Sequence, residues 1–242
     1  MIYENEIFKF WNKHPNLRGL IKKSISVLAV VNIEFGKIIG KTYTLLFSVL
    51  GTSWYDHRYD YLRGVENFFW LERAFYTLDR INNNDSLLDI GCGDGLFDGV
   101  FYTNKAKKIL AIDKDRNAIV HANKLYRKDN ILFQKKDITR WKIPSNYFEI
   151  VTLYAVIEHF PPEVGIQVLK NIKNGLKKNG MLLGSTPIFN HDKKDISNWE
   201  HKNEFISEIE LKKFLKEVFN NVKLKKTTWN KQRSDCYFEC SN

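Results

Sequence analysis

From residue 87 to residue 240 the chain alternates short apolar runs with segments whose apolar residues recur at helical spacing. The runs lie at 87–90, 109–112, 131–133, 150–154, 181–185 and 236–240, and a further strand is expected near 222–227. A helix is expected to begin at Pro161-Pro162 and to end at Asn179-Gly180. Its apolar face consists of Val164, Val168, Leu169, Ile172 and Leu176. Strands that alternate with helices predict βαβ units and an α/β fold.

The first 80 residues have a different pattern and are expected to form a helical extension or lid next to a domain at 81–242. Ser24 to Leu50 is largely apolar but contains three charged residues, Glu34, Lys37 and Lys41. The longest uncharged run, Thr42 to Tyr55, is shorter than the ~20 residues that span a bilayer, so no transmembrane helix is predicted. We expect two amphipathic helices that pack over the ligand site. The alternative is docking to a membrane surface or to a partner.

A dense polar and aromatic segment, Tyr55 to Gly64, follows these helices. Its rings and hydrogen-bonding groups suit a lid that contacts ligands, with Tyr59 and Arg63 as the candidate contacts. A structural linker explains the same composition equally well, and the sequence leaves both interpretations open.

A glycine-rich turn at Leu87 to Gly95 is the most informative stretch of the chain. An apolar strand ending at Ile90 is followed by glycines at alternate positions, Gly91, Gly93 and Gly95, with Cys92 between the first two, and a helix is expected to begin near Leu96. Glycine allows a ligand to approach the main chain and permits positive φ. The dinucleotide fingerprint needs its third glycine where Leu96 stands, which argues against phosphate binding. Asp89 adds a carboxylate at the strand end that suits a cationic ammonium group better than a pyrophosphate.

Acidic residues also stand at the ends of the next two predicted strands. Asp113 lies 18 residues after Gly95, close to the offset at which a βαβ unit presents an acid to a ribose. Asp137 and Ile138 follow the third strand, and the fourth strand ends at Tyr154. A series of signals at successive strand ends predicts one ligand site along the carboxyl edge of the sheet.

In this order and spacing the motifs resemble the class I S-adenosylmethionine-dependent methyltransferases, from about Leu87 to the C-terminus. The resemblance implies a Rossmann-like, doubly wound and mostly parallel seven-stranded sheet, and S-adenosylmethionine as cofactor. It also implies that Asp113 binds the ribose hydroxyls and that Asp137 and Ile138 hold the adenine. The full expected set of cofactor-binding residues is Asp89, Gly91, Cys92, Gly93, Gly95, Asp113, Lys114, Asp137, Ile138 and Tyr154.

Two histidines are the candidate catalytic bases for methyl transfer. His159 follows the fourth strand, near the expected position of the transferable methyl group, and its ordinary pKa near 6.5 suits proton transfer at neutral pH. Glu158 is expected to orient that imidazole or to bind the methionine end of the cofactor. His201 lies in a His-x-x-Glu-Phe segment that, in similar small-molecule methyltransferases, faces the acceptor. We expect O-methylation of a sugar, a glycolipid precursor or a phenol, held between the N-terminal segment and residues 189–205.

A second resemblance favours RNA as the methyl acceptor. The small-RNA terminal 2′-O-methyltransferases hold a divalent metal with Glu-x-x-Glu-His after the fourth strand and with a later histidine. This chain has Glu158, His159 and His201, but Ala155 replaces the first glutamate, so no metal is expected and the RNA function stays an alternative. A non-catalytic cofactor-binding module is another alternative, and an oxidoreductase is disfavoured by the missing third glycine.

The composition of the chain indicates its cellular compartment and the partners to expect. The chain has 242 residues, is 43% hydrophobic and 14% aromatic, and carries a formal charge of +10, which fits a globular protein with a lysine-rich surface. Scattered lysines and the lack of an aromatic basic motif make nucleic acid an unlikely partner. The three cysteines, Cys92, Cys236 and Cys240, fit a reducing compartment. Acidic residues near the N-terminus argue against a secretory signal. We expect a cytoplasmic protein, peripheral to a membrane if its helices dock there, and no oligomeric state is predicted.

Overall fold

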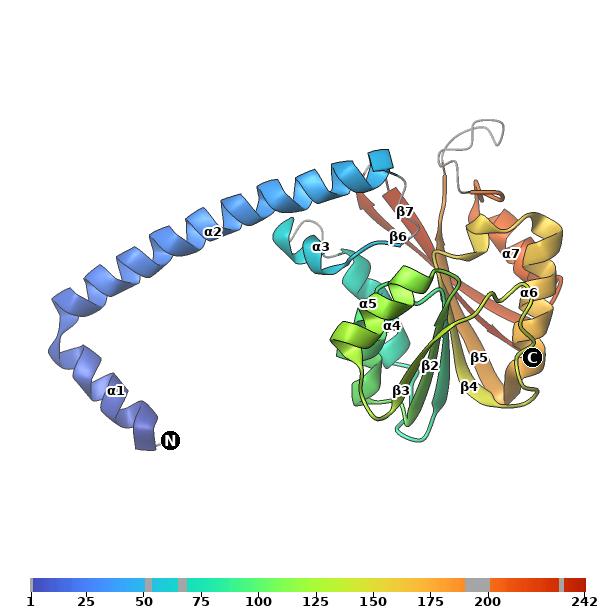
Figure 1. The fold of residues 1–242 in the computed structure, drawn as a ribbon, viewed down its shortest axis with the longest axis horizontal. Helices are drawn as coiled ribbons and strands as arrows, with labels where there is room; N and C mark the ends of the chain where they lie inside the picture. Colours follow the sequence, from blue (N-terminus) through green and yellow to red (C-terminus); the bar gives the residue numbers. More distant parts are fainter. Residues whose placement is uncertain (1, 51–53, 65–68, 190–200, 231–232) are drawn as a thin grey trace. The chain divides into compact units, whose positions relative to one another are not determined.

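The computed structural model describes residues 2–50, 54–64, 69–189, 201–230 and 233–242 (Figure 1). The chain forms two compact units. One consists of residues 1–52 and 58–68, and the other of residues 53–57 and 69–242. The first carries the N-terminal helices, and the second carries the whole sheet.

The second unit is built on a seven-stranded sheet, which confirms the predicted fold class. Its strands are β1 (Ser86–Ile90), β2 (Lys108–Asp113), β3 (Ile131–Lys135), β4 (Phe148–Tyr154), β5 (Leu176–Pro187), β6 (Asn221–Asn230) and β7 (Arg233–Ser241). The spatial order is β3-β2-β1-β4-β5-β7-β6. The first five pair in parallel, and β7 runs antiparallel to both β5 and β6. The order reverses between β1 and β4, where doubly wound sheets bind their ligands.

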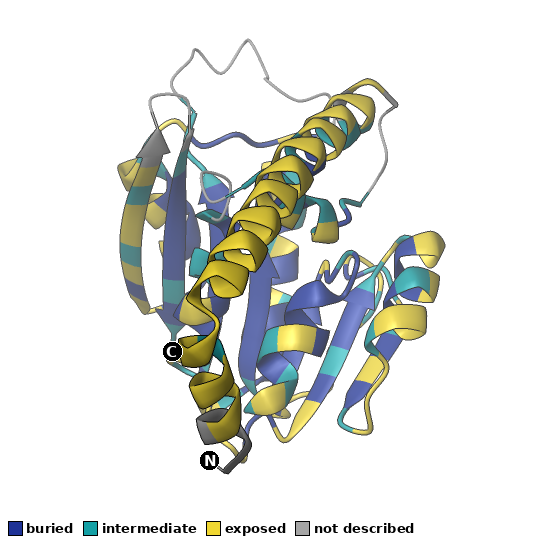
Figure 2. Cartoon of the chain, turned by 90° about the vertical axis from the view of Figure 1, so that its left-hand side faces the viewer, coloured by how far each residue is buried: buried dark blue, intermediate teal, exposed yellow. Residues whose placement is uncertain are grey.

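Helices cover both faces of this sheet and bury a core on each. The helical elements are α4 (Leu71–Leu78), η2 (Phe97–Phe101), η3 (Tyr102–Asn104), α5 (Arg116–Tyr126), η4 (Ile157–His159), α6 (Pro162–Gly175) and α7 (Glu208–Lys216). Neighbouring residues of a strand point to opposite faces, so Leu87 packs with α4 and α5 while Leu88 packs with α6 and α7. Figure 2 shows the central strands of the sheet as buried.

Two local expectations differ from the structure. Helix α6 ends at Gly175 and not at Asn179-Gly180, because Leu176 already pairs with Phe148 on β4. The register between β4 and β5 then shifts beyond Phe148, so Asn179-Gly180 falls in an irregular part of β5 and not in a helix cap. The helix expected near Leu96 is one π-helical turn followed by the short 3₁₀ helix η3.

The N-terminal unit contains α1 (Ile2–Lys13), α2 (Pro15–Leu50) and α3 (Arg58–Leu62). Figure 2 shows the surface of α2 as exposed along most of its length. Among the described residues, no helix is long and apolar enough to cross a membrane. Helix α4, which lies within the predicted 1–80 extension, is part of the second unit.

Candidate cofactor and acceptor site

The glycine loop leaves β1 and turns over the carboxyl end of β2. The backbone N–H groups of Gly91 and Cys92 both donate to the carbonyl of Ile112, at 2.8 and 3.1 Å. Gly91, Gly93 and Gly95 have φ angles of 77°, 53° and 75°, a region that glycine enters without the steric cost of a Cβ. The loop therefore needs glycine at each alternate position, as the sequence indicated.

The surroundings of the three glycines differ. A Cβ on Gly91 would lie 2.5 Å from Cγ2 of Val156, and a Cβ on Gly95 would lie 2.7 Å from Cβ of Ala122. A Cβ on Gly93 would meet no described atom within 4 Å. Packing within the protein thus excludes side chains at Gly91 and Gly95, whereas Gly93 presents open main chain to a ligand.

Asp113 holds this loop from the end of β2. Its Oδ2 accepts the N–H of Gly93 at 3.0 Å, and its Oδ1 accepts the N–H of Asp115 at 2.9 Å. Burial raises the pKa of Asp113, and these two amides act in the opposite direction. A carboxylate oxygen can accept more than one hydrogen bond, so Asp113 retains capacity for ribose hydroxyls. Lys114 is exposed.

A buried charged group lies on the α4 side of the sheet, at the end of β1. Asp89 is paired in register with Thr152 and accepts its hydroxyl at 2.5 Å. Burial raises the pKa of both Asp89 and Asp98, and for Asp98 the nearby charge of Asp89 adds to the effect. The positive charge of Arg73 opposes these increases. Its guanidinium carbon lies 3.2 Å from the ring centroid of Phe97.

This group has unused hydrogen-bonding capacity. Among the described residues, the carboxyl oxygens of Asp98 and Nε of Arg73 have no partner of good hydrogen-bond geometry, although the Asp98 and Asp89 carboxyls are close enough to hydrogen-bond when one of them is protonated. Buried polar atoms are normally paired, so acids and a cation in this state fit a ligand that carries both an ammonium and a carboxylate. The sequence prediction missed Arg73 and Asp98.

The sequence also missed a pair between His57 and the glycine loop. Asp94 is fully buried, and its carboxylate accepts the backbone N–H of His57 at 2.7 Å. The imidazole Nδ1 of His57 lies 3.2 Å from Oδ1 of the same carboxylate. Although burial alone would raise the pKa of Asp94, the His57 charge and these hydrogen bonds hold it below its ordinary value. Tyr59 and Arg63, the candidate lid contacts, interact within the N-terminal unit, where Tyr59 stacks on Tyr43 and Arg63 approaches Asp60, and their contact with a ligand stays a prediction.

The predicted adenine pair follows β3. Asp137 is half-buried and accepts both the hydroxyl and the N–H of Thr139, at 2.7 and 3.0 Å. The Thr139 hydroxyl bond is the main reason why the pKa of Asp137 is lowered. Ile138 is buried.

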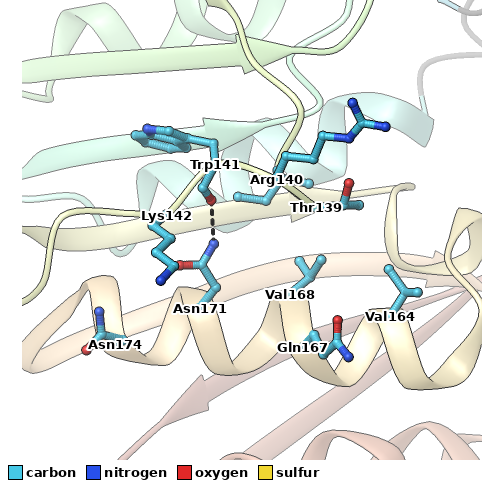
Figure 3. Close-up of a pocket in the computed structure, with 10 residues that line it drawn as sticks. Thr139, Arg140, Trp141, Lys142, Val164, Gln167, Val168, Asn171 and Asn174 are labelled. Atoms are coloured by element: carbon cyan, nitrogen blue, oxygen red, sulfur yellow. Dashed lines mark hydrogen bonds between the residues drawn. The ribbon is translucent and has the colours of Figure 1, made fainter.

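A cavity of about 270 Å³ lies between the segment 138–142 and helix α6 (Figure 3). Its walls include Trp141 and Asn171, which are joined by a hydrogen bond of 2.8 Å from the Asn171 amide to the Trp141 carbonyl. Of the predicted site residues only Ile138 lines this cavity. The cavity is therefore distinct from the space above the glycine loop.

Two predicted cofactor residues have side chains turned into the protein. The Tyr154 hydroxyl lies 2.6 Å from the Thr77 hydroxyl on α4, and its ring belongs to the core on that face. Burial raises the pKa of Tyr154 and also that of Cys92, whose side chain is in the same core. Only the main chain of these two residues is suited to contact a ligand.

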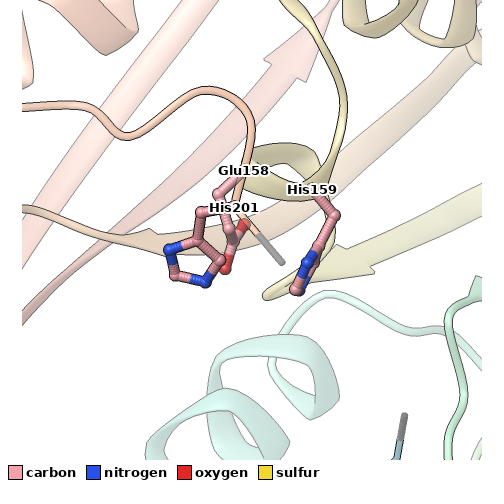
Figure 4. Close-up of side chains that lie close together, drawn as sticks. All are labelled: Glu158, His159 and His201. Atoms are coloured by element: carbon pink, nitrogen blue, oxygen red, sulfur yellow. The ribbon is translucent and has the colours of Figure 1, made fainter. Parts of the chain in front are cut away.

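The candidate catalytic residues come together after β4 (Figure 4). Ligand-type atoms of Glu158, His159 and His201 all lie within 4.8 Å of one another. The backbone carbonyl of Glu158 accepts the N–H groups of Lys202 and Asn203, at 2.8 and 3.0 Å, which fixes the His201 segment against η4. The predicted acceptor loop is described only in part, because residues 190–200 lie outside the described ranges.

Two members of this cluster, His201 and Glu158, have a buried supporting group. Glu204 is buried, and its carboxylate lies 2.5 Å from Nδ1 of His201. Glu158 is also buried and accepts the hydroxyl of Thr186 at 3.1 Å. The rings of His159 and His201 meet edge to face, with centroids 5.1 Å apart. The cluster can therefore accept a proton at an imidazole held by a carboxylate.

Comparison with known proteins agrees with this architecture. Residues 87–180 match the family model of a methyltransferase domain. The fold resembles an S-adenosylmethionine-dependent methyltransferase from Archaeoglobus fulgidus, with 16% identity, a TM-score of 0.59, and coverage of 74% of this chain and 96% of the other. It also resembles the N-methyltransferase NodS from Bradyrhizobium japonicum, with 18% identity, a TM-score of 0.56, and coverage of 72% and 97%.

A third structure contains a cofactor product. It is phosphoethanolamine N-methyltransferase 2 from Haemonchus contortus with phosphomonomethylethanolamine and S-adenosylhomocysteine, with 12% identity, a TM-score of 0.61, and coverage of 72% of this chain and 52% of the other. No curated protein sequence matches the chain. The domain match and the shared fold support a class I S-adenosylmethionine-dependent methyltransferase, and they support S-adenosylmethionine as its cofactor.

Proposed function

We propose that this protein transfers a methyl group from S-adenosylmethionine to a hydroxyl group of a small molecule. The observation that carries the proposal is the cluster of Glu158, His159 and His201 after β4, at the carboxyl edge that also carries the glycine loop after β1. A base at this edge suits a hydroxyl acceptor, because an alcohol has to lose a proton when it is methylated.

The residues of the chain fit the parts of this cofactor. We assign the ribose hydroxyls to Asp113 and the adenine to Asp137 and Ile138. Asp89, Asp98 and Arg73 offer opposite charges for the methionine ammonium and carboxylate, and the open main chain at Gly93 lets the ligand lie against the loop. When bound, S-adenosylmethionine supplies a methyl group that is already activated by a positively charged sulfur.

Catalysis then consists of positioning and proton removal. His201 accepts the acceptor proton at Nε2, because Glu204 holds Nδ1 and stabilises the imidazolium that forms. His159 faces His201 and positions the acceptor hydroxyl. The sequence alone favoured His159 as the base. Separate His159→Ala and His201→Ala variants distinguish the two assignments by the size of the fall in turnover.

Transfer of labelled methyl groups tests the proposal. The purified protein is incubated with labelled S-adenosylmethionine and with matched acceptors, namely sugars, phenols and a glycolipid precursor on one side and primary amines on the other. We expect label on a hydroxyl acceptor, and we expect His201→Ala to lose turnover while it still binds S-adenosylhomocysteine. Transfer to amines alone would contradict O-methylation but not methyl transfer itself.

A second candidate, metal-assisted 2′-O-methylation of RNA, is favoured by one observation. A carboxylate and two imidazoles within 4.8 Å of one another are a ligand set that divalent ions accept, and Glu204 supports His201 as outer-sphere carboxylates support metal-bound histidines. Ala155, at the position of the missing glutamate, contributes no ligand. Activity on RNA 3′ ends that is lost with a chelator and restored by Mn²⁺ would favour this candidate. Chelator-resistant transfer to a small molecule would exclude it.

A further inference from the structure

Helix α2 has one apolar face along its whole length. Of its fifteen exposed large apolar side chains, thirteen fall within one arc of about 160° when residues are placed at 100° intervals around the helix axis. They include Leu20, Leu28, Val31, Phe35, Ile38 and Leu45, which are between 61% and 68% exposed. No charged residue of α2 falls within the arc. An exposed apolar face of this size on a helix of 36 residues marks an interaction surface.

The opposite side of α2 is packed and polar. Helix α3 lies against it at two glycines one turn apart. A Cβ on Gly40 would lie 2.6 Å from Cγ of Arg63, and one on Gly36 would lie 3.4 Å from Cδ2 of Leu62. The charged side chains of α2 occupy this same side. The N-terminal unit therefore uses one face of α2 for its own packing and leaves the other exposed.

Helices α1 and α2 carry more basic than acidic side chains. The described side chains of α1 and α2 include seven lysines and arginines but only two glutamates, and each glutamate pairs with a lysine on its own helix. Arg18 lies beside one border of the apolar arc and Lys23 and Lys41 lie beside the other, where Glu34 also lies, paired with Lys37. From there the long basic side chains reach phosphate groups at the level of lipid headgroups while the apolar face enters the acyl region.

We propose that α2 docks in the plane of an anionic membrane surface through its apolar face. The lysines and arginines beside the arc complement anionic headgroups. A coiled coil with a second copy would need only a narrower apolar stripe than the arc of α2, so the width of the arc favours a membrane surface. The helix lies on the bilayer and does not cross it, which agrees with the lack of a membrane-spanning helix among the described residues.

Vesicle co-sedimentation of the full chain tests this proposal with two matched double variants. Leu28→Glu/Val31→Glu places two carboxylates on the apolar face. Val30→Glu/Ile33→Glu makes the same change of charge on the polar side, at residues of comparable exposure. We expect the wild type to bind phosphatidylcholine vesicles that contain phosphatidylglycerol about tenfold more tightly than pure phosphatidylcholine vesicles. The apolar-face variant should lose about tenfold in affinity, and the polar-side variant should lose clearly less.

If something other than a membrane covers the apolar face of α2, these experiments give different results. A wild-type protein that ignores both vesicle types overturns the proposal. If light scattering then shows a dimer that Leu28→Glu/Val31→Glu dissociates, a second copy covers the face. If the protein is a monomer and the same variant lowers its melting temperature, the face packs on its own chain. Equal losses in both double variants also overturn the proposal, because charge alone would then explain binding. Cofactor binding is a separate readout, so failure here leaves the proposed methyl transfer untouched.

Discussion

His57 and Asp94 form a two-point contact in which the backbone N–H of His57 donates to Oδ2 of Asp94 at 2.7 Å and its imidazole lies 3.2 Å from Oδ1. Asp94 also accepts the N–H of Leu96 at 3.1 Å, at the exit of the glycine loop. The contact thus ties the residues that precede α3 to the loop that we assign to the cofactor.

This contact makes stability depend on pH. Because the pKa of Asp94 is lowered from its ordinary value of 3.8, its contribution is present above that value and is lost as the pH falls through the lower, folded-state pKa. We expect Asp94→Asn to cost about 1–3 kcal/mol near neutral pH and the difference from wild type to shrink below about pH 4. Urea denaturation at several pH values measures this, with exposed Asp129→Asn as the control. A difference that persists unchanged in acid would contradict the ion pair.

The glycines of the loop should respond differently to alanine. Gly95→Ala places a Cβ 2.7 Å from Ala122 and 2.8 Å from Phe133 at a φ of 75°, so we expect a loss of about 3 kcal/mol in the free energy of unfolding. Gly93→Ala meets open space at a φ of 53°, and the expected loss is about 1 kcal/mol. Cofactor affinity should fall in Gly93→Ala, since its methyl group enters the space above the loop. Denaturation and calorimetric titration of both variants check this, and equal stabilities would refute the packing argument.

The hydrogen bond between Thr77 and Tyr154 is expected to be structural. Tyr154→Phe leaves the buried Thr77 hydroxyl without this partner, and we predict a loss of about 1–2 kcal/mol with unchanged affinity for S-adenosylhomocysteine. Adding Thr77→Val should recover part of the loss, because both polar groups are then removed. Weaker cofactor binding in Tyr154→Phe would show that its side chain contributes to the site after all.

Glu204 is expected to act through His201. Glu204→Gln keeps the shape of the side chain but removes the charge that stabilises the imidazolium, so turnover should fall about 10- to 100-fold while cofactor affinity and melting temperature change little. The control is Glu208→Gln, an exposed residue at the start of α7. An unchanged turnover in Glu204→Gln would remove His201 from the role of base.

Local patterns in the sequence predicted most of the fold. Each of the six apolar runs lies within a strand, because a buried strand needs a run of apolar residues, and the strand expected near 222–227 lies within β6. The sequence did not predict that the Tyr154 side chain points into the core, because the end of a strand does not indicate which face of the sheet its last side chain occupies. Its side chain shares the α4 face with Thr152, two positions earlier.

The charged partners of the site could not be predicted in the same way. Arg73 and His57 come from segments upstream of the sheet, and nothing in their local sequence indicates that Arg73 lies near Asp98 or that His57 contacts Asp94. Glu204 was visible only as part of the His-x-x-Glu-Phe segment, and its contact with His201 depends on the turn of the backbone between them. Such contacts between separate segments follow from the tertiary fold and not from periodicity.

The central claim, that the glycine loop and Asp113 form an S-adenosylmethionine site, is tested most directly by calorimetric titration with S-adenosylhomocysteine. NAD serves as the ligand control. We predict saturable binding to the wild type, a loss of about 1–3 kcal/mol in Asp113→Ala, and a smaller loss in Asp113→Asn, which keeps an oxygen for the Gly93 amide. No binding of S-adenosylhomocysteine, or equal affinity in wild type and Asp113→Ala, would contradict the account.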